Sequence, residues 1–108
     1  MSGFEDREKG QEAKFAHDAE LAFKAEARRN KLLGIWAAEQ MGVTDDAAKA
    51  AYAAEVVAAD FAEVGEEDVV RKVMGDFKQK NVTVSEADLR AKMAQLVAVA
   101  REQVQREG

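Results

Sequence analysis

The 108-residue sequence contains no cysteine and no proline, and it has only one histidine, one tryptophan and one tyrosine. Without cysteine the chain can form neither a disulfide nor a thiolate metal site. A single histidine is also too few for the usual transition-metal centres, so we expect no metal. The lack of proline removes the residue that most strongly interrupts helices. Long helices are therefore compatible with the whole sequence.

Several functional motifs are missing as well. No apolar run approaches the roughly 18 residues of a membrane-spanning helix, and the N-terminus has no signal-peptide pattern. No phosphate-binding glycine loop, dinucleotide fingerprint or G-x-S-x-G motif occurs. The acidic run at 65–68 lacks the alternating oxygen ligands of an EF-hand. We expect a soluble cytoplasmic protein with no enzymatic activity, no cofactor and no direct insertion into a membrane.

The net charge of −5 is distributed unevenly along the chain. Residues 1–34 carry seven acids and seven bases, residues 35–70 nine acids and one base, and residues 71–108 five acids and eight bases. An acidic middle segment argues against a continuous phosphate-binding surface, so no nucleic-acid partner is expected. This distribution favours ion pairs between segments, or a basic protein partner.

What the sequence does contain is abundant alanine, glutamate, lysine, arginine and glutamine, which are all good helix formers. Apolar residues recur at helical spacing in four segments. The sequence therefore predicts an all-α fold, a small antiparallel four-helix bundle formed by residues 18–108. The four predicted helices span approximately residues 18–41, 44–64, 66–80 and 85–104.

Local signals mark the ends of these helices. Gly42 is well placed to end the first helix in a left-handed cap. Thr44 is the expected N-cap of the second, and Ser85 with Asp88 resembles a capping box at the start of the fourth. Gly75 should weaken the third helix by about 1 kcal/mol relative to alanine. The predicted core residues are Leu32, Trp36, Val57, Phe61, Val73, Phe77, Leu96 and Val97.

Residues 1–17 have little to bury. Of the 29 large apolar residues in the chain, only three fall in the first 20 positions. Phe4 and Phe15 are eleven residues, or about three turns, apart and would share one face of a helix. The segment is either an idle frayed tail or an arm that is flexible or marginally helical alone and helical when bound. Phe23 falls almost opposite the apolar stripe of the first bundle helix.

Arg28, Arg29 and Lys31 form a second unusual feature, because Arg28 falls inside that apolar stripe. One interpretation is a basic docking patch or a phosphate site. The structural interpretation is that the side-chain stems pack on the core while the charged ends pair with acids of the middle segment, such as Asp60 or Glu63.

Two long strings carry a resemblance to a known family. They are "EDREKGQEAKFAHDAELAFKAEARRNKLLGIWAAEQMG" at 5–42 and "EVVAADFAEVGEEDVVRKVMGDF" at 55–77. The chain resembles the zeta subunit of alphaproteobacterial ATP synthase, a small natural inhibitor of the rotary ATPase. The resemblance implies a four-helix domain and an N-terminal arm that inserts into the catalytic head of the synthase. The arm would block ATP hydrolysis at an interface between nucleotide-binding subunits, close to the rotor.

The resemblance also implies partners and a location: the catalytic head subunits and rotor of the synthase, at the cytoplasmic side of the inner membrane. Phe4 and Phe15 would be the apolar anchors of the arm, and Phe23, Arg28 and Arg29 would extend the contact or serve the fold. The alternative is a helical protein-interaction or nucleotide-sensing module that does not inhibit and that binds nucleotide weakly through Arg28, Arg29 and Lys31. Charge complementarity in the arm would come from Asp6, Arg7, Glu8, Lys9, Glu12 and Lys14.

Overall fold

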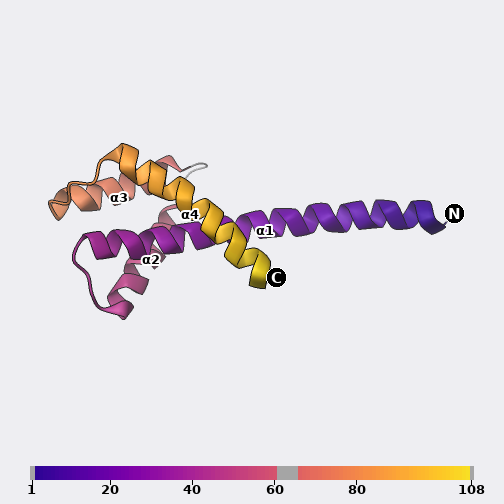
Figure 1. The fold of residues 1–108 in the computed structure, drawn as a ribbon, viewed down its shortest axis with the longest axis horizontal. Coiled ribbons are helices and arrows are strands. Elements are labelled where there is room, and N and C mark those ends of the chain that lie inside the picture. Colours follow the sequence, from indigo (N-terminus) through magenta and orange to yellow (C-terminus); the bar gives the residue numbers. More distant parts are fainter. Residues whose placement is uncertain (1, 61–65, 108) are drawn as a thin grey trace.

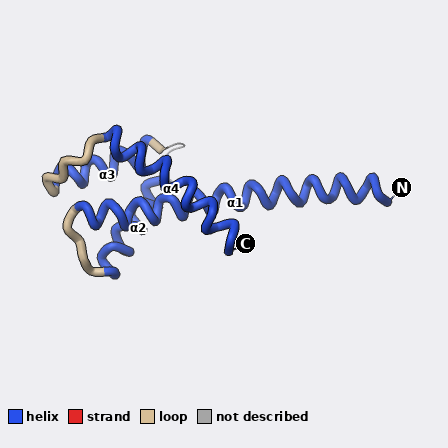
Figure 2. Tube along the Cα trace, in the orientation of Figure 1, coloured by secondary structure: helices blue, strands red, loops and turns tan. Residues whose placement is uncertain are grey.

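Four helices make up the fold in the computed structural model, which describes the backbone of residues 2–60 and 66–107 and the side chains from residue 19 onward within those ranges. They are α1 (Ser2–Gln40), α2 (Asp46–Asp60), α3 (Glu67–Gln79) and α4 (Glu86–Glu107). Figure 2 shows that the described backbone is helical apart from short connections. The predicted all-α, four-helix fold is confirmed. The predicted core residue Phe61 lies outside the described residues.

The long helix α1 is the axis of the molecule (Figure 1). Its C-terminal half packs against α2 and α4, and α3 contacts the three other helices. The chain of α4 runs back beside α1, and the N-terminal part of α1 projects away from the bundle (Figure 1). The molecule is correspondingly elongated, with principal extents of 65 × 25 × 21 Å.

The start of α1 differs from the sequence-based expectation. The apolar stripe predicted a first helix from about Asp18, whereas helical backbone continues without a break from Ser2 to Gln40. The segment before Asp18 lacks proline, and half of residues 2–17 are glutamate, lysine, alanine or glutamine, so helix remains accessible there despite Gly3 and Gly10 and the missing apolar stripe. The apolar periodicity therefore identifies the part of α1 that packs against the bundle. The helix propensity of the preceding residues accounts for the continuation of the helix toward the N-terminus.

The predicted glycine cap at the end of α1 is confirmed. Gly42 has a φ of 85°, in the left-handed region. Its backbone N–H donates to the carbonyl of Glu39 at 3.0 Å, and the N–H of Val43 donates to the carbonyl of Ala38 at 3.0 Å. These two bonds form a Schellman motif, which satisfies carbonyls that the helix end would otherwise leave unpaired.

The N-caps of α2 and α4 come from local side chains. Ser85 Oγ accepts a hydrogen bond from the N–H of Asp88 at 3.1 Å, as predicted. At α2 the prediction of Thr44 was wrong by one residue. Asp45 is the N-cap, and its carboxylate accepts from the N–H of Ala48 at 2.9 Å. An aspartate caps as well as or better than threonine and its negative charge also suits the helix dipole, so the neighbouring residue takes the position.

The core contains Val73, Phe77 and Leu96, as predicted, and the predicted Leu32 and Trp36 pack against it. Two residues next to predicted ones are more deeply buried than expected. Leu33 and Val56 are fully buried, whereas Leu32 and Val57 are only half-buried. The reason is the small residues of α1, which bring α2 close to the face that carries Leu33. Trp36 and Val97 are half-buried, and Trp36 meets Phe77 edge to face at a centroid distance of 6.0 Å. The main buried cluster is Leu33, Ala37, Val56, Val69, Val70, Val73, Phe77, Leu89, Met93 and Leu96.

Replacing Gly75 by alanine is expected to stabilise the protein by up to about 1 kcal/mol, because alanine is the better helix former. Gly75 lies inside α3, and a Cβ built there meets nothing within 4 Å. Urea unfolding followed by circular dichroism would measure the change. A loss of stability in Gly75→Ala would contradict the open space that the structure gives this position.

Candidate interaction surface

The N-terminal arm, residues 2–17, is the first part of the candidate surface. Its backbone forms the projecting end of α1 (Figure 1). The side chains of eight predicted partner-binding residues lie outside the described ones. The structure therefore gives the path of the arm's backbone and not its side-chain contacts. These eight residues are Phe4, Asp6, Arg7, Glu8, Lys9, Glu12, Lys14 and Phe15.

The C-terminal end of α4 holds α1 where the arm leaves the bundle. The Arg28 guanidinium donates to the side-chain oxygen of Gln103 at 2.9 Å and to the carboxylate of Glu107 at 2.7 Å. The hydrogen bond between Arg28 and Glu107 raises the pKa of Arg28 and lowers the pKa of Glu107. Ala25 of α1 and Val104 of α4 are both buried at the same crossing. The helix is therefore attached to the bundle within about two turns of the arm.

Arg29 is a buried residue that joins α1 to the end of α2. Its guanidinium donates twice to the side-chain oxygen of Asn30, at 3.1 and 2.9 Å, and lies 3.9 Å from the carboxylate of Asp60. The distance to Asp60 is too long for a hydrogen bond, so that contact is a buried ion pair. Partial burial, together with the neighbouring Asp60, raises the pKa of Glu26. Acidic and basic groups thus meet at this helix junction.

These contacts favour the structural interpretation of the basic residues. Arg29 pairs with Asp60, one of the acids that the structural interpretation named. Arg28 also has an internal partner, but Glu107 lies at the C-terminus and not in the acidic middle segment. Of the three, only Lys31 has no carboxylate within 4.0 Å among the described residues. A phosphate site formed by all three side chains would have to break both arginine pairs, so these positions favour the structural role.

Phe23 is exposed, as its position opposite the apolar stripe predicted. It is 60% exposed, and only one other large apolar side chain in the described chain, Val99, falls in the exposed class. It lines a hollow of about 330 Å³ together with Ala27, Val57 and Val104. This exposed ring lies on α1 six residues beyond the arm.

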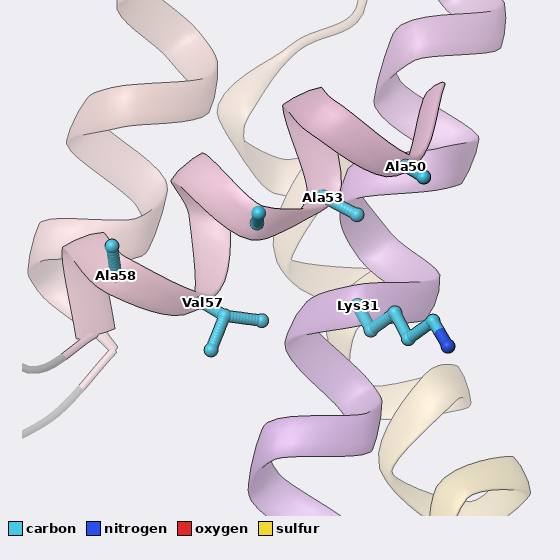
Figure 3. A pocket seen from close by; sticks show the side chains of 6 residues that line it. Lys31, Ala50, Ala53, Val57 and Ala58 are labelled. Carbon is cyan, nitrogen blue, oxygen red and sulfur yellow. The ribbon is translucent and has the colours of Figure 1, made fainter. Parts of the chain in front are cut away.

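The sequence-based reading missed an apolar groove that follows Phe23 along the bundle. Residues of α2 line it together with Lys31 of α1, around a volume of about 410 Å³ (Figure 3). The sequence does signal this face, because the alanines recur at helical spacing and would allow a neighbouring helix to approach closely. The two hollows share Lys31 and Val57 and therefore adjoin one another. The α2 residues of the groove are Ala50, Ala53, Ala54, Val57 and Ala58.

Neither a metal-binding cluster nor a membrane-spanning helix occurs in the described part of the chain. Among residues 19–60 and 66–107, no three histidine, cysteine or acidic side chains are grouped so as to hold a metal ion. No helix in the described part of the chain combines the length and apolar character needed to cross a membrane.

Comparison with known proteins places the chain in a family. The family model for ATPase inhibitor subunit zeta matches residues 1–103. A protein whose structure was determined in solution by NMR is 56% identical, with a TM-score of 0.70, over 80% of this chain and 96% of the other. A comparison with curated proteins found no match. Because the family model covers nearly the whole sequence, this chain belongs to the ATPase inhibitor subunit zeta family.

Proposed function

We propose that this protein inhibits ATP hydrolysis by the catalytic head of ATP synthase, and that residues 2–17 act as a wedge inserted at a catalytic interface close to the rotor. Membership of the inhibitor family supports the activity. The observation that carries the mechanism is the projecting first half of α1, which leaves the bundle as a free helical end (Figure 1). In this proposal the partners are the subunits of the catalytic head and the rotor, and the protein is held at the inner membrane only through them.

The attachment of the arm to the bundle lowers the cost of ordering it. Starting a helix in isolation is unfavourable, because several residues must be fixed before the first hydrogen bond forms. Here the bundle already fixes α1 from Leu21 onward, so helix can extend into the arm from an existing end. Extension still costs about 1–2 kcal/mol of backbone entropy per residue, which helical hydrogen bonds only partly offset.

Binding to the catalytic head would supply the free energy that is still needed to order the arm. Full burial of two phenylalanine side chains contributes about 3–6 kcal/mol on transfer scales. The charged residues between Phe4 and Phe15 would add complementarity and fix the register. A wedge of this kind acts sterically, because it must be expelled before the next rotary step, and it requires no catalytic residue.

The bundle has a separate role in this proposal. The contact of Arg28 with Gln103 and Glu107, and that of Arg29 with Asp60, hold α1 at a fixed direction relative to α2 and α4. The bundle therefore presents the arm and stays outside the interface that the arm enters. Arg28 and Arg29 serve the fold in this account, and Phe23 extends the contact.

Phe15→Ala is expected to weaken inhibition about 10–100-fold without unfolding the bundle, the usual loss when a buried aromatic anchor is truncated. The measurement is the half-inhibitory concentration for ATP hydrolysis by the isolated catalytic head, together with thermal unfolding of the free protein. An equal fall in stability would show instead that Phe15 belongs to the core. Trp36→Ala, at a core-packed position of the same helix, is the matched control and should lower stability.

A further inference from the structure

We propose that the groove formed by α1 and α2 is a second contact with the same partner, and that it receives a helix with small apolar side chains flanked by carboxylates. This inference rests on the proposed function, since it assigns the groove to the assembly that binds the arm. The groove is defined here as Lys31 with Ala50, Ala53, Ala54, Val57 and Ala58.

The composition of this face of α2 is unusual for a helix surface. An exposed helix face normally carries charged and polar residues, yet Ala50, Ala54 and Ala58 are all exposed and uncharged. Val57 from α2 and Lys31 from α1 border the same space (Figure 3). Small side chains of this kind leave room for another helix backbone to come close, since the distance between packed helices depends on the residues at the contact.

Continuity with the arm argues that the occupant is the arm's partner. The groove joins the hollow beside Phe23 through Lys31 and Val57. Phe23 is on α1, between the arm and Lys31, so a surface that binds the arm and continues along the bundle would meet Phe23 first and then the alanines. Because the arm carries only two large apolar anchors, a neighbouring apolar contact would supply area that the arm lacks.

The charges at the edge of the groove indicate a partner with carboxylates. Lys24 and Lys31 are both exposed beside this surface. Lys24 pairs with the exposed Glu20 at 3.1 Å on the same helix. The carboxylate of Glu107, which pairs with Arg28, lines the same hollow as both lysines. Lys31 has no carboxylate within 4.0 Å in residues 19–60 and 66–107. Three basic side chains, Lys24, Arg28 and Lys31, against the two acids Glu20 and Glu107 leave a net positive charge beside the uncharged strip, which complements an amphipathic helix with acidic flanks.

The test uses the full chain with Ala54→Glu, which places a charge in the groove at an exposed helix position and keeps a good helix former. Ala94→Glu is the matched control, because Ala94 is exposed on α4 away from the groove. Binding to the isolated catalytic head and inhibition of its ATP hydrolysis are measured together. We expect Ala54→Glu to weaken both at least about tenfold, since a charge in an apolar contact is strongly unfavourable. Ala94→Glu should change neither, and both variants should keep the wild-type melting temperature.

The outcomes separate this inference from the proposed function. If the wild type neither binds nor inhibits the head, the proposed function fails and the inference fails with it. If the wild type inhibits and Ala54→Glu inhibits equally well, the groove is not a contact and the proposed function stands. Sedimentation of the free protein tests whether a second copy of the chain occupies the groove. A wild-type dimer that Ala54→Glu converts to a monomer would show that a second copy covers the groove, which overturns the inference.

A charge test addresses the carboxylates. Raising the salt concentration should weaken binding of the wild type to the head, because exposed ion pairs are screened. Lys31→Gln should bind more weakly at low salt and depend less on salt than the wild type. An unchanged salt dependence in Lys31→Gln would overturn the proposed acidic flank of the partner.

Discussion

Deleting residues 1–16 is expected to abolish inhibition of ATP hydrolysis, with a rise of at least about 100-fold in the half-inhibitory concentration, while the bundle stays folded. A loss of that size corresponds to about 2.7 kcal/mol of binding free energy, which is less than two buried phenylalanine anchors can contribute. The stability should change by no more than about 0.5 kcal/mol, because every buried core residue of the described chain lies at or beyond Ala25.

The shortened helix has a favourable new beginning. It would start near His17, with Asp18 and Glu20 in its first turn, where negative charge interacts well with the helix dipole. Circular dichroism should show a loss of helical signal that corresponds only to the removed residues. If the truncated protein had the same half-inhibitory concentration as the full-length protein, the arm would not be the effector. A bundle that unfolds on truncation would show that the arm is part of the fold.

The parts of the fold that follow from local chemistry could be predicted from the sequence. Gly42 ends α1 and Ser85 caps α4, because each depends on residues within one turn. The third helix ends in the same way, with Asn81 at a φ of 58° and the N–H of Val82 bonded to the carbonyl of Phe77 at 2.9 Å. Asparagine tolerates this left-handed conformation better than most residues, but the sequence reading did not assign it the position.

Which face of each helix is buried was harder to predict, because it depends on which neighbouring helix packs against it. The helical spacing of the apolar residues predicts Leu32 and Val57 for the core, on the apolar stripes of their helices. The structure buries Leu33 and Val56, because small residues on α1 bring α2 against that side. A shift of one residue turns a helix by about 100°, so the predicted core residue Val57 lies in the groove instead.

Contacts between distant parts of the sequence were the hardest to predict. Arg28 and Glu107 are 79 residues apart, and no pattern in the sequence joins them. The acidic middle segment offered nearer partners in sequence, and only the crossing of α1 with α4 selects the C-terminus instead. The shortage of apolar residues before position 18, by contrast, indicates from composition alone that this segment has little to bury in the core, whereas its role as an inhibitory arm is what the resemblance implies.

Gly34→Ala is expected to destabilise the protein by about 1–2 kcal/mol, although the same substitution at Gly75 should stabilise it. Gly34 is buried where α1 crosses α2, and a Cβ built there would lie 2.5 Å from the Cα of Ala53. That contact is with backbone, so the two helices must move apart. Overpacking of this kind typically costs about 1–3 kcal/mol, and the better helix propensity of alanine returns at most about 1 kcal/mol.

A double variant identifies the clashing atom. If backbone is the obstacle, Ala53→Gly in the Gly34→Ala protein cannot restore stability, because it removes only the Cβ at 3.1 Å and leaves the Cα at 2.5 Å. The double variant should therefore be no more stable than Gly34→Ala alone, as measured by urea unfolding. Recovery to the wild-type value would show that side-chain crowding sets the spacing of α1 and α2. Because that spacing also positions Lys31 beside the α2 alanines, Gly34→Ala should widen the groove as well as weaken the fold.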